Sequence, residues 1–404
     1  MRILKVSATY FPFLEKGGPP VKVRALARGL EARGHQVTVL TADLGEAAGT
    51  PLRPSPYGRS YEEGGVEAVY LQSRPRLRSV AWHRGRERFC RERLGAYDVA
   101  HVYGLYDLLG PAVAAHCRAR GIPYVVEPIG MFRPITRSIW LKRAYHRLWG
   151  KRLVAGAARV IATAEQELEE LVGEGVPREK IVLRRNGVEP PDELPARGTF
   201  WAERKLPERQ KRILFLGRLV GKKSPELLLE AFFRLMSRKP ALDAHLVFAG
   251  PDEGEGMLRR LKAGVARRGL EERVSFVGPL YGQEKWAAYR DADVFVLPSQ
   301  NENFGNTAAE AVTAGVPVIL TETCGIAPLL ANRAGMVVPH DAEAIAGALA
   351  DLLGNEPLRR RLAAGCAAVL PQLGWEEPVG QMEALYAELL RLKSSRESEN
   401  AQTA

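Results

Sequence analysis

The sequence has little cysteine and no long apolar run, and each absence excludes a class of protein. Its cysteines are scattered and show no Cys-x-x-Cys spacing, which favours free thiols in a reducing compartment over a disulfide framework or a zinc site. No apolar stretch approaches the roughly 18 residues that a membrane-spanning helix needs, and the first apolar run is too short for a signal peptide. We therefore expect a cytoplasmic protein, or one peripheral on the inner face of a membrane. The cysteines are Cys90, Cys117, Cys324 and Cys366.

Motifs for dinucleotide, metal and nucleic-acid binding are missing as well. A β-α-β pattern opens the chain but lacks Gly-x-Gly-x-x-Gly, so the dinucleotide fingerprint is absent. Asp291-Ala-Asp293 precedes its strand and does not follow it, so it does not stand where a metal-bound nucleotide would bind. No nucleic-acid recognition motif accompanies the basic residues. We expect no metal site and no nucleic-acid partner.

Positive charge is concentrated in the first half of the chain. Residues 1–180 hold 29 Lys and Arg against 18 Asp and Glu, an excess of 11 that equals the net charge of +11 for all 404 residues. Residues 181–404 hold 29 residues of each sign. The imbalance therefore predicts an anionic partner for the first half.

The most informative stretch lies between residues 294 and 320. Residues 294–297 are all apolar, which predicts a short buried parallel strand, and residues 316–320 predict the next one. Between them lie a loop and a short helix, which Asn306 can cap and which Gly315 and Pro317 end.

Two glutamates stand in this loop and helix. In an open α/β sheet, ligands bind at the carboxyl ends of strands, and helix N-termini attract phosphate. Glu302 therefore faces a ligand from the loop, and Glu310 lies about one turn inside the helix. Two carboxylates beside an anion-binding helix start suit an anionic ligand that also carries hydroxyl groups.

A second pattern of this kind begins at residue 212. An apolar strand ends in Gly217-Arg218, and Lys223 stands two residues before Pro225, a favoured first residue of a helix. Two cations beside a helix N-terminus suit a diphosphate, whose negative charge grows when it leaves.

Together these residues resemble a known family. Pro-Ser-x-x-Glu-x-Phe-Gly, followed by Glu-Ala and Gly-Val-Pro-Val-Ile, is similar to the signature of the retaining, nucleotide-sugar-dependent glycosyltransferases of family 4, and Gly-Arg-Leu-x-x-x-Lys fits the same family. The resemblance covers nearly the whole chain. It implies the GT-B fold, an α/β fold class with two Rossmann-like domains that face each other across a cleft and a C-terminal helix that crosses back to the first domain.

The resemblance also implies roles for individual residues on the donor side. Arg218 and Lys223 would neutralise the diphosphate leaving group, Glu302 would orient the sugar hydroxyls, and these three are the catalytic candidates. Glu310 would accept from the ribose. The remaining donor-binding candidates are Gly17, Gly18, Asn303, Phe304, Gly305, Asn306 and Thr307.

On the acceptor side the resemblance points to His101, Tyr103, Glu127 and Gly130. Relatives often show His-x-His-Gly where this chain has His101-Val-Tyr103-Gly, and His or Arg directly before the glycine that matches Gly130. Here that residue is Ile129, whose side chain cannot donate a proton or a hydrogen bond. A lone histidine is more often a satisfied structural residue than a catalytic one, and we keep that expectation for His101.

A basic segment at residues 133–152 has two interpretations. Five apolar residues recur in it at helical spacing with cations between them, which is typical of an interfacial helix beside anionic lipid. The alternative is a core-facing helix with a solvated cationic face. A second basic segment covers residues 74–93. The five apolar residues are Trp140, Leu141, Tyr145, Leu148 and Trp149.

The chain divides into two domains and a tail. We expect an N-terminal, acceptor-side domain at 1–188, joined by the crossing helix at 375–393. A linker at 189–211 contains four prolines, and the nucleotide-sugar domain covers 212–374. Residues 45–65 read as a loop and residues 394–404 as a disordered tail.

These expectations give one reaction and several rivals. The reaction is retaining transfer of a sugar from a UDP- or GDP-linked donor to a lipid-linked or saccharide acceptor in cell-surface polysaccharide or glycolipid assembly, without cofactor or metal. Rivals are a non-catalytic nucleotide-sugar-binding or membrane-surface scaffolding subunit of the same fold, a basic adaptor for anionic membrane or nucleic acid, and an epimerase or phosphorylase-like GT-B enzyme. The donor base and sugar, the acceptor and the linkage stay open.

Overall fold

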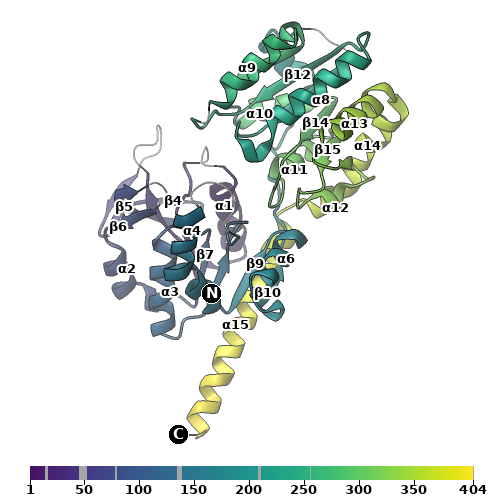
Figure 1. The fold of residues 1–404 in the computed structure, drawn as a ribbon. Helices are drawn as coiled ribbons and strands as arrows, with labels where there is room; N and C mark the ends of the chain where they lie inside the picture. Colours follow the sequence, from purple (N-terminus) through teal and green to yellow (C-terminus); the bar gives the residue numbers. More distant parts are fainter. Residues whose placement is uncertain are drawn as a thin grey trace. The chain divides into compact units, whose positions relative to one another are not determined.

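The structure is a computed structural model that describes residues 1–13, 17–44, 52–77, 80–133, 139–207, 211–254 and 256–403. It divides into two compact units (Figure 1). Unit 1 comprises Met1–Asn186 and Trp375–Ala404, and unit 2 comprises Gly187–Gly374. The C-terminal helix therefore belongs to unit 1. Within the two basic segments, residues 78–79 and 134–138 lie outside the described residues.

Unit 1 is built on one largely parallel sheet. In the described part of the chain it has ten strands, in the order β10-β9-β8-β7-β1-β2-β5-β4-β3, with β6 paired to β5. The pairs from β10 to β5 are parallel, and the pairs made by β3, β4 and β6 are antiparallel. The strands are β1 (Arg2–Ser7), β2 (Gln36–Asp43), β3 (Arg53–Ser55), β4 (Gly58–Glu63), β5 (Val66–Leu77), β6 (Val80–His83), β7 (Val99–Tyr103), β8 (Tyr124–Glu127), β9 (Arg159–Ala162) and β10 (Ile181–Leu183).

Helices cover both faces of this sheet, which explains why its central strands are apolar on both sides. Ile3 of β1 packs in the core with α1 and α15, whereas Leu4 packs in the core on the opposite face with α3 and α5. The helices are α1 (Gly18–Glu31), α2 (Arg86–Glu92), η2 (Leu94–Ala96), α3 (Leu109–Ala119), α4 (Ile139–Tyr145), the π-helical turn η3 (His146–Gly150), α5 (Lys151–Ala155), α6 (Glu165–Gly173), η4 (Arg178–Lys180) and α15 (Glu376–Thr403).

Unit 2 is a second α/β layer structure. Its six described strands form a parallel sheet in the order β13-β12-β11-β14-β15-β16. Successive residues of β11 alternate between two cores: Ile213 and Phe215 pack with α8, α9 and α13, and Leu214 and Leu216 pack with α7, α10 and α11. The strands are β11 (Lys211–Leu216), β12 (Ala244–Ala249), β13 (Val274–Gly278), β14 (Val294–Leu297), β15 (Val318–Thr321) and β16 (Gly335–Val338).

The strand order of unit 2 determines where a ligand can bind. The chain moves outward from β11 to β13 and then returns to place β14 on the other side of β11, so β11 and β14 flank the point where strand order reverses. The helices are α7 (Thr199–Glu203), η5 (Gly221–Lys223), α8 (Pro225–Arg238), α9 (Met257–Arg267), η6 (Glu271–Arg273), α10 (Gly282–Asp291), α11 (Asn306–Thr313), α12 (Ala327–Leu330), α13 (Ala342–Gly354), α14 (Glu356–Val369) and η7 (Leu370–Gln372).

Three predicted segments differ from the structure. Part of the predicted loop at 45–65 is the β3–β4 hairpin, whose residues are too polar to show an apolar alternation; residues 45–51 lie outside the described residues. The predicted linker at 189–211 belongs to unit 2 and contains α7, with Trp201 buried. The predicted disordered tail continues α15 to Thr403, because polar residues without glycine or proline are compatible with a helix.

The cysteines and the helix lengths bear on two further predictions, a reducing compartment and the absence of a membrane-spanning helix. All four cysteines are free and buried, and burial raises the pKa of Cys90 and Cys324 to about 11, so these thiols are poor nucleophiles. Among the described residues, no helix combines the length and apolarity needed to cross a bilayer.

Candidate active site

The donor-side candidates of unit 2 come together where β11 and β14 end. Lys223, in η5 after β11, forms an ion pair with Glu302, in the loop after β14. The backbone N–H of Gln300 donates to the carbonyl of Lys222 at 2.9 Å, so the two loops are also joined through the main chain. Residues 79 positions apart in sequence are thus placed side by side at the carboxyl edge of the sheet.

The loop that carries Glu302 is held by its neighbour after β15. The N–H of Glu302 donates to the carbonyl of Thr323 at 3.0 Å, and the N–H of Gly325 donates to the carbonyl of Glu302 at 2.9 Å. Thr323 in turn donates its hydroxyl to the carbonyl of Ser299 at 2.7 Å. The carboxylate of Glu302 therefore projects from a backbone fixed on both sides, as expected of a group that orients a substrate.

Gly305 forms the N-cap of α11, so the prediction that Asn306 caps this helix is wrong by one residue. Gly305 has φ +107°, a conformation that a residue with a Cβ rarely adopts, and Asn306 is the first helical residue. A Cβ at Gly305 would lie 2.9 Å from Cγ2 of Ile326, so the turn is also closely packed. Asn303, Phe304 and Thr307 lie on either side of this cap, and Phe304 is buried. The first turn of α11 thus presents backbone N–H groups at the same edge as Lys223 and Glu302.

Glu310 lies one turn inside α11, as predicted, and two residues of α10 hold its carboxylate. Lys285 Nζ donates at 2.8 Å and the Tyr289 hydroxyl at 2.9 Å. Tyr289 is fully buried, and burial together with the negative charge of Glu310 raises the pKa of its hydroxyl well above the usual value, so it remains a donor. Neither partner was predicted from the sequence, although Lys285 and Tyr289 are four residues apart and therefore share one face of their helix.

Arg218 follows β11 but stands apart from the Lys223–Glu302 pair. Its guanidinium contacts the carboxylate of Glu253 at 3.1 Å, and both side chains are about half exposed. Such an exposed pair contributes little to stability, so Arg218 can exchange this contact for an incoming anion at low cost.

Gly250, at the end of β12, lies against Gly217. A Cβ at Gly250 would lie 1.8 Å from the carbonyl oxygen of Gly217, so the chain at this edge has no room for a larger residue. The close approach keeps the segment that leads to Arg218 near the sheet.

Comparison with known proteins identifies this arrangement. A family model described as glycosyl transferases group 1 matches residues 198–365, and one described as glycosyl transferase 4-like domain matches residues 17–187. A D-inositol 3-phosphate glycosyltransferase of Streptomyces bingchenggensis is 30% identical over 393 residues, which cover 93% of this chain and 86% of the relative. The chain belongs to the group 1, family 4 glycosyltransferases. It is therefore a glycosyltransferase that uses a nucleotide-sugar donor.

Solved structures agree on the fold of this glycosyltransferase. The sucrose-phosphate synthase of Thermosynechococcus elongatus matches with a TM-score of 0.76 at 22% identity, covering 97% of this chain and all of the other. The HepE protein of Anabaena, solved with UDP and glucose, matches with a TM-score of 0.72 at 15% identity, covering 96% of this chain and all of the other. At these identities the matches show the GT-B fold alone.

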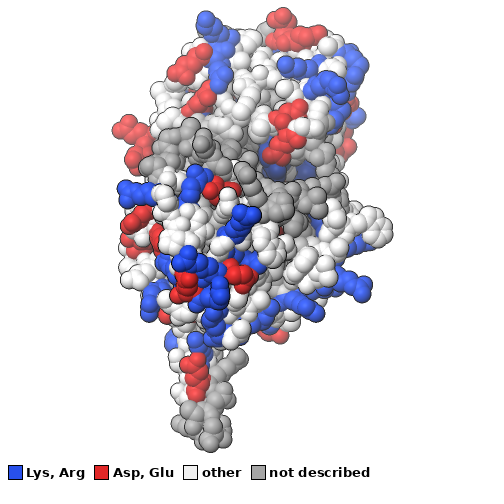
Figure 2. Space-filling view, turned by 90° about the vertical axis from the view of Figure 1, so that its left-hand side faces the viewer, with Lys and Arg blue, Asp and Glu red and all other residues white. Residues whose placement is uncertain are grey.

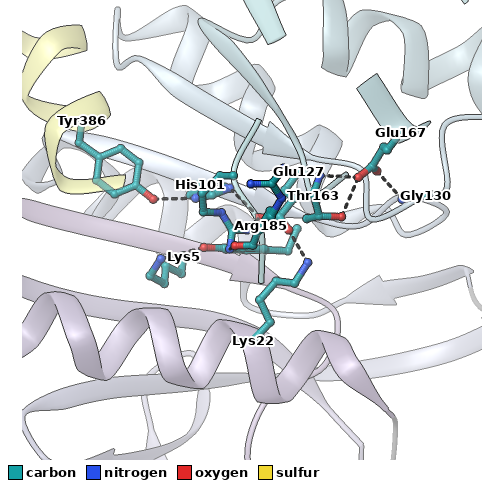
Figure 3. Close-up of polar contacts among 11 residues, drawn as sticks. Lys5, Lys22, His101, Glu127, Gly130, Thr163, Glu167, Arg185 and Tyr386 are labelled. Atoms are coloured by element: carbon teal, nitrogen blue, oxygen red, sulfur yellow. Dashed lines mark hydrogen bonds and ion pairs between the residues drawn. The ribbon is translucent and has the colours of Figure 1, made fainter. Parts of the chain in front are cut away.

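In unit 1 of the glycosyltransferase, three of the acceptor-side candidates lie inside a buried polar cluster (Figure 3). Glu127, at the end of β8, is fully buried and accepts from Lys22 of α1 and from Arg184, each at 2.5 Å. Burial alone would raise the pKa of Glu127, but Arg184 and Lys22 outweigh it, and the net shift is downward. Glu127 is therefore an ionised structural centre, and its carboxylate is fully buried.

His101 and Tyr103 of β7 belong to the same cluster. His101 is fully buried, and its Nδ1 lies 2.6 Å from the hydroxyl of Tyr386 in α15. Its ring stacks on the ring of Tyr103, with 4.0 Å between the ring centroids. Burial and the nearby Lys5 lower the pKa of His101 well below its usual value, so the ring is neutral. The hydroxyl of Tyr103 accepts from Lys5 at 2.8 Å. This burial favours the structural interpretation of His101, and the acceptor-side role of His101 and Tyr103 stays a prediction.

Gly130 is the one acceptor-side candidate on the surface of this cluster. Its N–H donates to Glu167 at 2.5 Å, and the other carboxylate oxygen of Glu167 accepts from the N–H and hydroxyl of Thr163 at 2.8 and 2.9 Å. Ile129 and Gly130 have φ +57° and +65°. A β-branched residue at positive φ is strained, and such strain is found where a turn has a function.

The remaining donor-side candidates of unit 1 are Gly17 and Gly18. Gly17 has φ +97° and forms the N-cap of α1, and Gly18 is its first residue. Among the described residues, no atom lies within 4 Å of the position where a Cβ of Gly17 would be. Gly17 is thus required by its backbone conformation, whatever binds beside it.

Proposed function

We propose that this glycosyltransferase transfers a sugar, with retention at the anomeric carbon, from a UDP- or GDP-linked donor held mainly by unit 2. The observation that carries the proposal is the Lys223–Glu302 pair beside the first turn of α11. A cation beside a carboxylate can bind both parts of a nucleotide-sugar. The cation pairs with the diphosphate, and the carboxylate accepts hydrogen bonds from the sugar hydroxyls. The HepE protein was solved with UDP and glucose, so UDP-sugars are the first donors to test.

In this proposal each donor-side residue has one task. Arg218 and Lys223 neutralise the departing diphosphate, and Asn303 and the N–H groups of residues 304–307 bind sugar and phosphate. Glu302 orients the sugar, and Glu310 accepts from the ribose, with Lys285 and Tyr289 fixing its carboxylate. The sequence-derived expectation of a reaction without metal is part of the proposal, because fixed cations can stabilise the leaving group in place of one.

We propose that unit 1 binds an anionic acceptor in cell-surface polysaccharide or glycolipid assembly. The charge excess of residues 1–180 supports this, since it favours a lipid-linked diphosphate or an acidic saccharide. The name of the Streptomyces relative supports a second acceptor class, a soluble phosphorylated polyol such as inositol phosphate. The free, buried cysteines fit the proposed site of action, the cytoplasm or the inner face of a membrane.

Product analysis tests the reaction. The purified protein is incubated without added metal and with excess EDTA, with one donor at a time and with three acceptors: inositol phosphate, a polyprenyl-diphosphate saccharide and a soluble neutral oligosaccharide. Proton NMR of the product reports its anomeric configuration. We expect the product to have the same anomeric configuration as the donor sugar. It should form in the presence of EDTA and only with an anionic acceptor.

Each other outcome contradicts a specific part of the proposal. An inverted product contradicts retention, and activity that EDTA abolishes contradicts a metal-free reaction. Transfer to the neutral oligosaccharide alone contradicts an anionic acceptor. Donor binding without transfer or hydrolysis would support the non-catalytic subunit.

A further inference from the structure

The exposed surface of α4, η3 and α5 carries an inference beyond the reaction itself. Four of the five apolar residues that recur here face solvent: Trp140 is 80% exposed, Leu141 54%, Leu148 52% and Trp149 40%. Only Tyr145 is buried, at 4%. Large apolar side chains grouped in one short segment mark an interaction site, whereas single exposed ones are ordinary.

This segment already has a complete inner face, so the exposed residues are not needed for folding. Tyr145, His146, Leu153 and Val154 are buried, and the Tyr145 hydroxyl donates to the carbonyl of Asp107 at 2.9 Å. His146 Nε2 lies 3.0 Å from the hydroxyl of Tyr106. The prediction of a core-facing helix is therefore wrong for all the apolar residues except Tyr145.

The π-helical turn η3 aligns the exposed residues. Eight steps of a regular α-helix rotate the chain by about 800°, which would turn Leu148 roughly 80° away from Trp140. A π-turn contains more residues than an α-turn and so reduces this rotation. It brings Leu148 toward the face of Trp140 and Trp149 toward that of Leu141. One exposed apolar strip results, which we call the α4–α5 strip.

Charge decides which partner fits the α4–α5 strip. Residues 128–164 contain eight Lys and Arg and no Asp or Glu. Arg143, Arg147, Lys151 and Arg152 alternate with the apolar residues, and no carboxylate pairs with them in the part of the chain that the structure describes. The Arg143 guanidinium lies 5.6 Å from the centre of the Trp140 ring. Figure 2 shows one face of the molecule, on which Lys and Arg lie among Asp and Glu.

We propose that the α4–α5 strip docks on an anionic lipid bilayer. Tryptophan and leucine enter the headgroup region, and the arginines and lysines around them meet lipid phosphates. A protein partner with an acidic apolar groove, or a second copy of this chain, would leave the tryptophans buried at an interface and not in lipid. The proposal deepens the acceptor assignment, since it brings unit 1 to the surface where a lipid-linked acceptor would be, but docking does not depend on the donor chemistry.

Vesicle flotation with matched variants tests the proposal. The vesicles contain phosphatidylcholine alone or phosphatidylcholine with phosphatidylglycerol. Trp140→Ser/Leu148→Ser removes apolar contacts, and Arg143→Glu/Arg147→Glu reverses two charges; all four side chains point outward, so both variants should fold. The first control is Trp82→Ser, which removes a tryptophan of unit 1 that is 52% exposed on β6. The second is Arg259→Glu/Arg361→Glu, which makes the same charge change on exposed helices of unit 2.

We expect the wild type to bind vesicles only when phosphatidylglycerol is present, and its tryptophan emission to shift to the blue. Each basic residue near an anionic surface contributes about a fivefold change in binding, so the charge-reversed variant should bind more than tenfold more weakly. The serine variant should bind the vesicles about tenfold more weakly than the wild type. Both controls should bind as the wild type does.

Other results overturn the proposal. These are no binding by the wild type, unchanged binding by both strip variants, or an equal loss in the controls. A wild-type dimer in sedimentation that Trp140→Ser/Leu148→Ser dissociates would assign the strip to self-association instead. Thermal stabilisation by donor sugar is measured on every variant; because it should persist in all of them, a failure of the donor site is distinguishable from a failure of docking.

Discussion

At the scale of single residues, the proposed donor site contains two adjacent lysines with different contacts. Lys223 pairs with Glu302, whereas Lys222 contributes its carbonyl to the hydrogen bond with Gln300. The two adjacent lysines therefore form a matched pair for substitution.

We predict that Lys223→Ala lowers kcat about 100-fold or more and changes KM little, because its charge matters most while the diphosphate leaves. Lys222→Ala should retain most of the activity. Steady-state kinetics with the identified donor checks both. An Arg218→Ala/Lys223→Ala variant with wild-type turnover would remove these residues from the mechanism.

A second residue-scale prediction concerns Lys5, buried in β1 beside Tyr103. Burial, with the positive charge of Arg184, lowers the pKa of Lys5 to about 7. An unfolded lysine has a pKa near 10.4, so between about pH 7 and pH 9 the unfolded chain binds a proton that the folded chain does not. The contribution of Lys5 to the free energy of unfolding therefore rises with pH across this window and levels off below it.

Lys5→Met should flatten this pH dependence. Urea unfolding at pH 7, 8 and 9 measures the slope for wild type and variant. Equal slopes in the two proteins would show that Lys5 is charged in the folded state and that its burial has another explanation.

At the scale of elements, the turn into α11 combines a backbone requirement with close packing. Gly305→Ala places a Cβ at φ +107° and 2.9 Å from Ile326, so we predict a loss of about 1–3 kcal/mol in the free energy of unfolding of unit 2 and weaker donor binding.

Gly347→Ala is the matched control, because Gly347 lies within α13 with open space where a Cβ would be. It should stabilise unit 2 by about 0.5–1 kcal/mol. Chemical denaturation of both variants gives the comparison. Two changes of the same sign would mean that the conformation of Gly305 is not a constraint.

Most helices and strands were predicted from the sequence, and those that were missed have no apolar pattern of their own. Strands such as 294–297 were predicted because buried parallel strands are uninterrupted apolar runs. The β3–β4 hairpin lies at a sheet edge and has no such run, and the π-turn at His146–Gly150 leaves no local trace in the pattern. Apolar spacing showed a helix near residue 140 but could not show which face is buried, because that depends on Tyr106 and Asp107 from another part of unit 1.

The sequence also predicted the positions of the donor-side candidates better than the contacts that hold them. Glu302, Glu310 and Lys223 follow strands and open helices, so local pattern places them at one edge. The residues that fix Glu310 come from α10, and Lys22 and Arg184, which neutralise Glu127, come from elements far apart in sequence. Only the fold brings such groups together. Lys22 did carry a signal, as a cation among the apolar residues of α1.

At the scale of the whole molecule, unit 1 is completed by the last segment of the chain. Val379, Met382 and Tyr386 of α15 pack in the core of unit 1, and Arg159 of β9 pairs with Glu388 at 2.7 Å. Residues beyond 393 add no buried side chain among those described.

A chain ending at Gly374 should therefore lose the stability of unit 1 and keep that of unit 2. A chain ending at Lys393 should behave as the full chain. Hydrogen exchange followed peptide by peptide checks this: we expect fast exchange across β1 and α1 in the first truncation, with β11 and β14 still protected. Equal loss of protection in both units would show that α15 stabilises the molecule in a way that the two-unit division does not describe.

The central claim is that unit 2 binds a nucleotide-sugar through Glu310 and its neighbours, and thermal stabilisation tests it most directly. Melting of the purified protein is followed with a panel of UDP-, GDP- and ADP-sugars, for the wild type, for Glu310→Ala, and for the control Glu343→Ala, which also removes a carboxylate with two basic partners. A ligand at 100 times its Kd stabilises by about 2.7 kcal/mol. We predict that one nucleotide-sugar raises the Tm of the wild type and of Glu343→Ala by several degrees and leaves Glu310→Ala unchanged. A panel without any shift, or an equal shift in Glu310→Ala, would contradict the account.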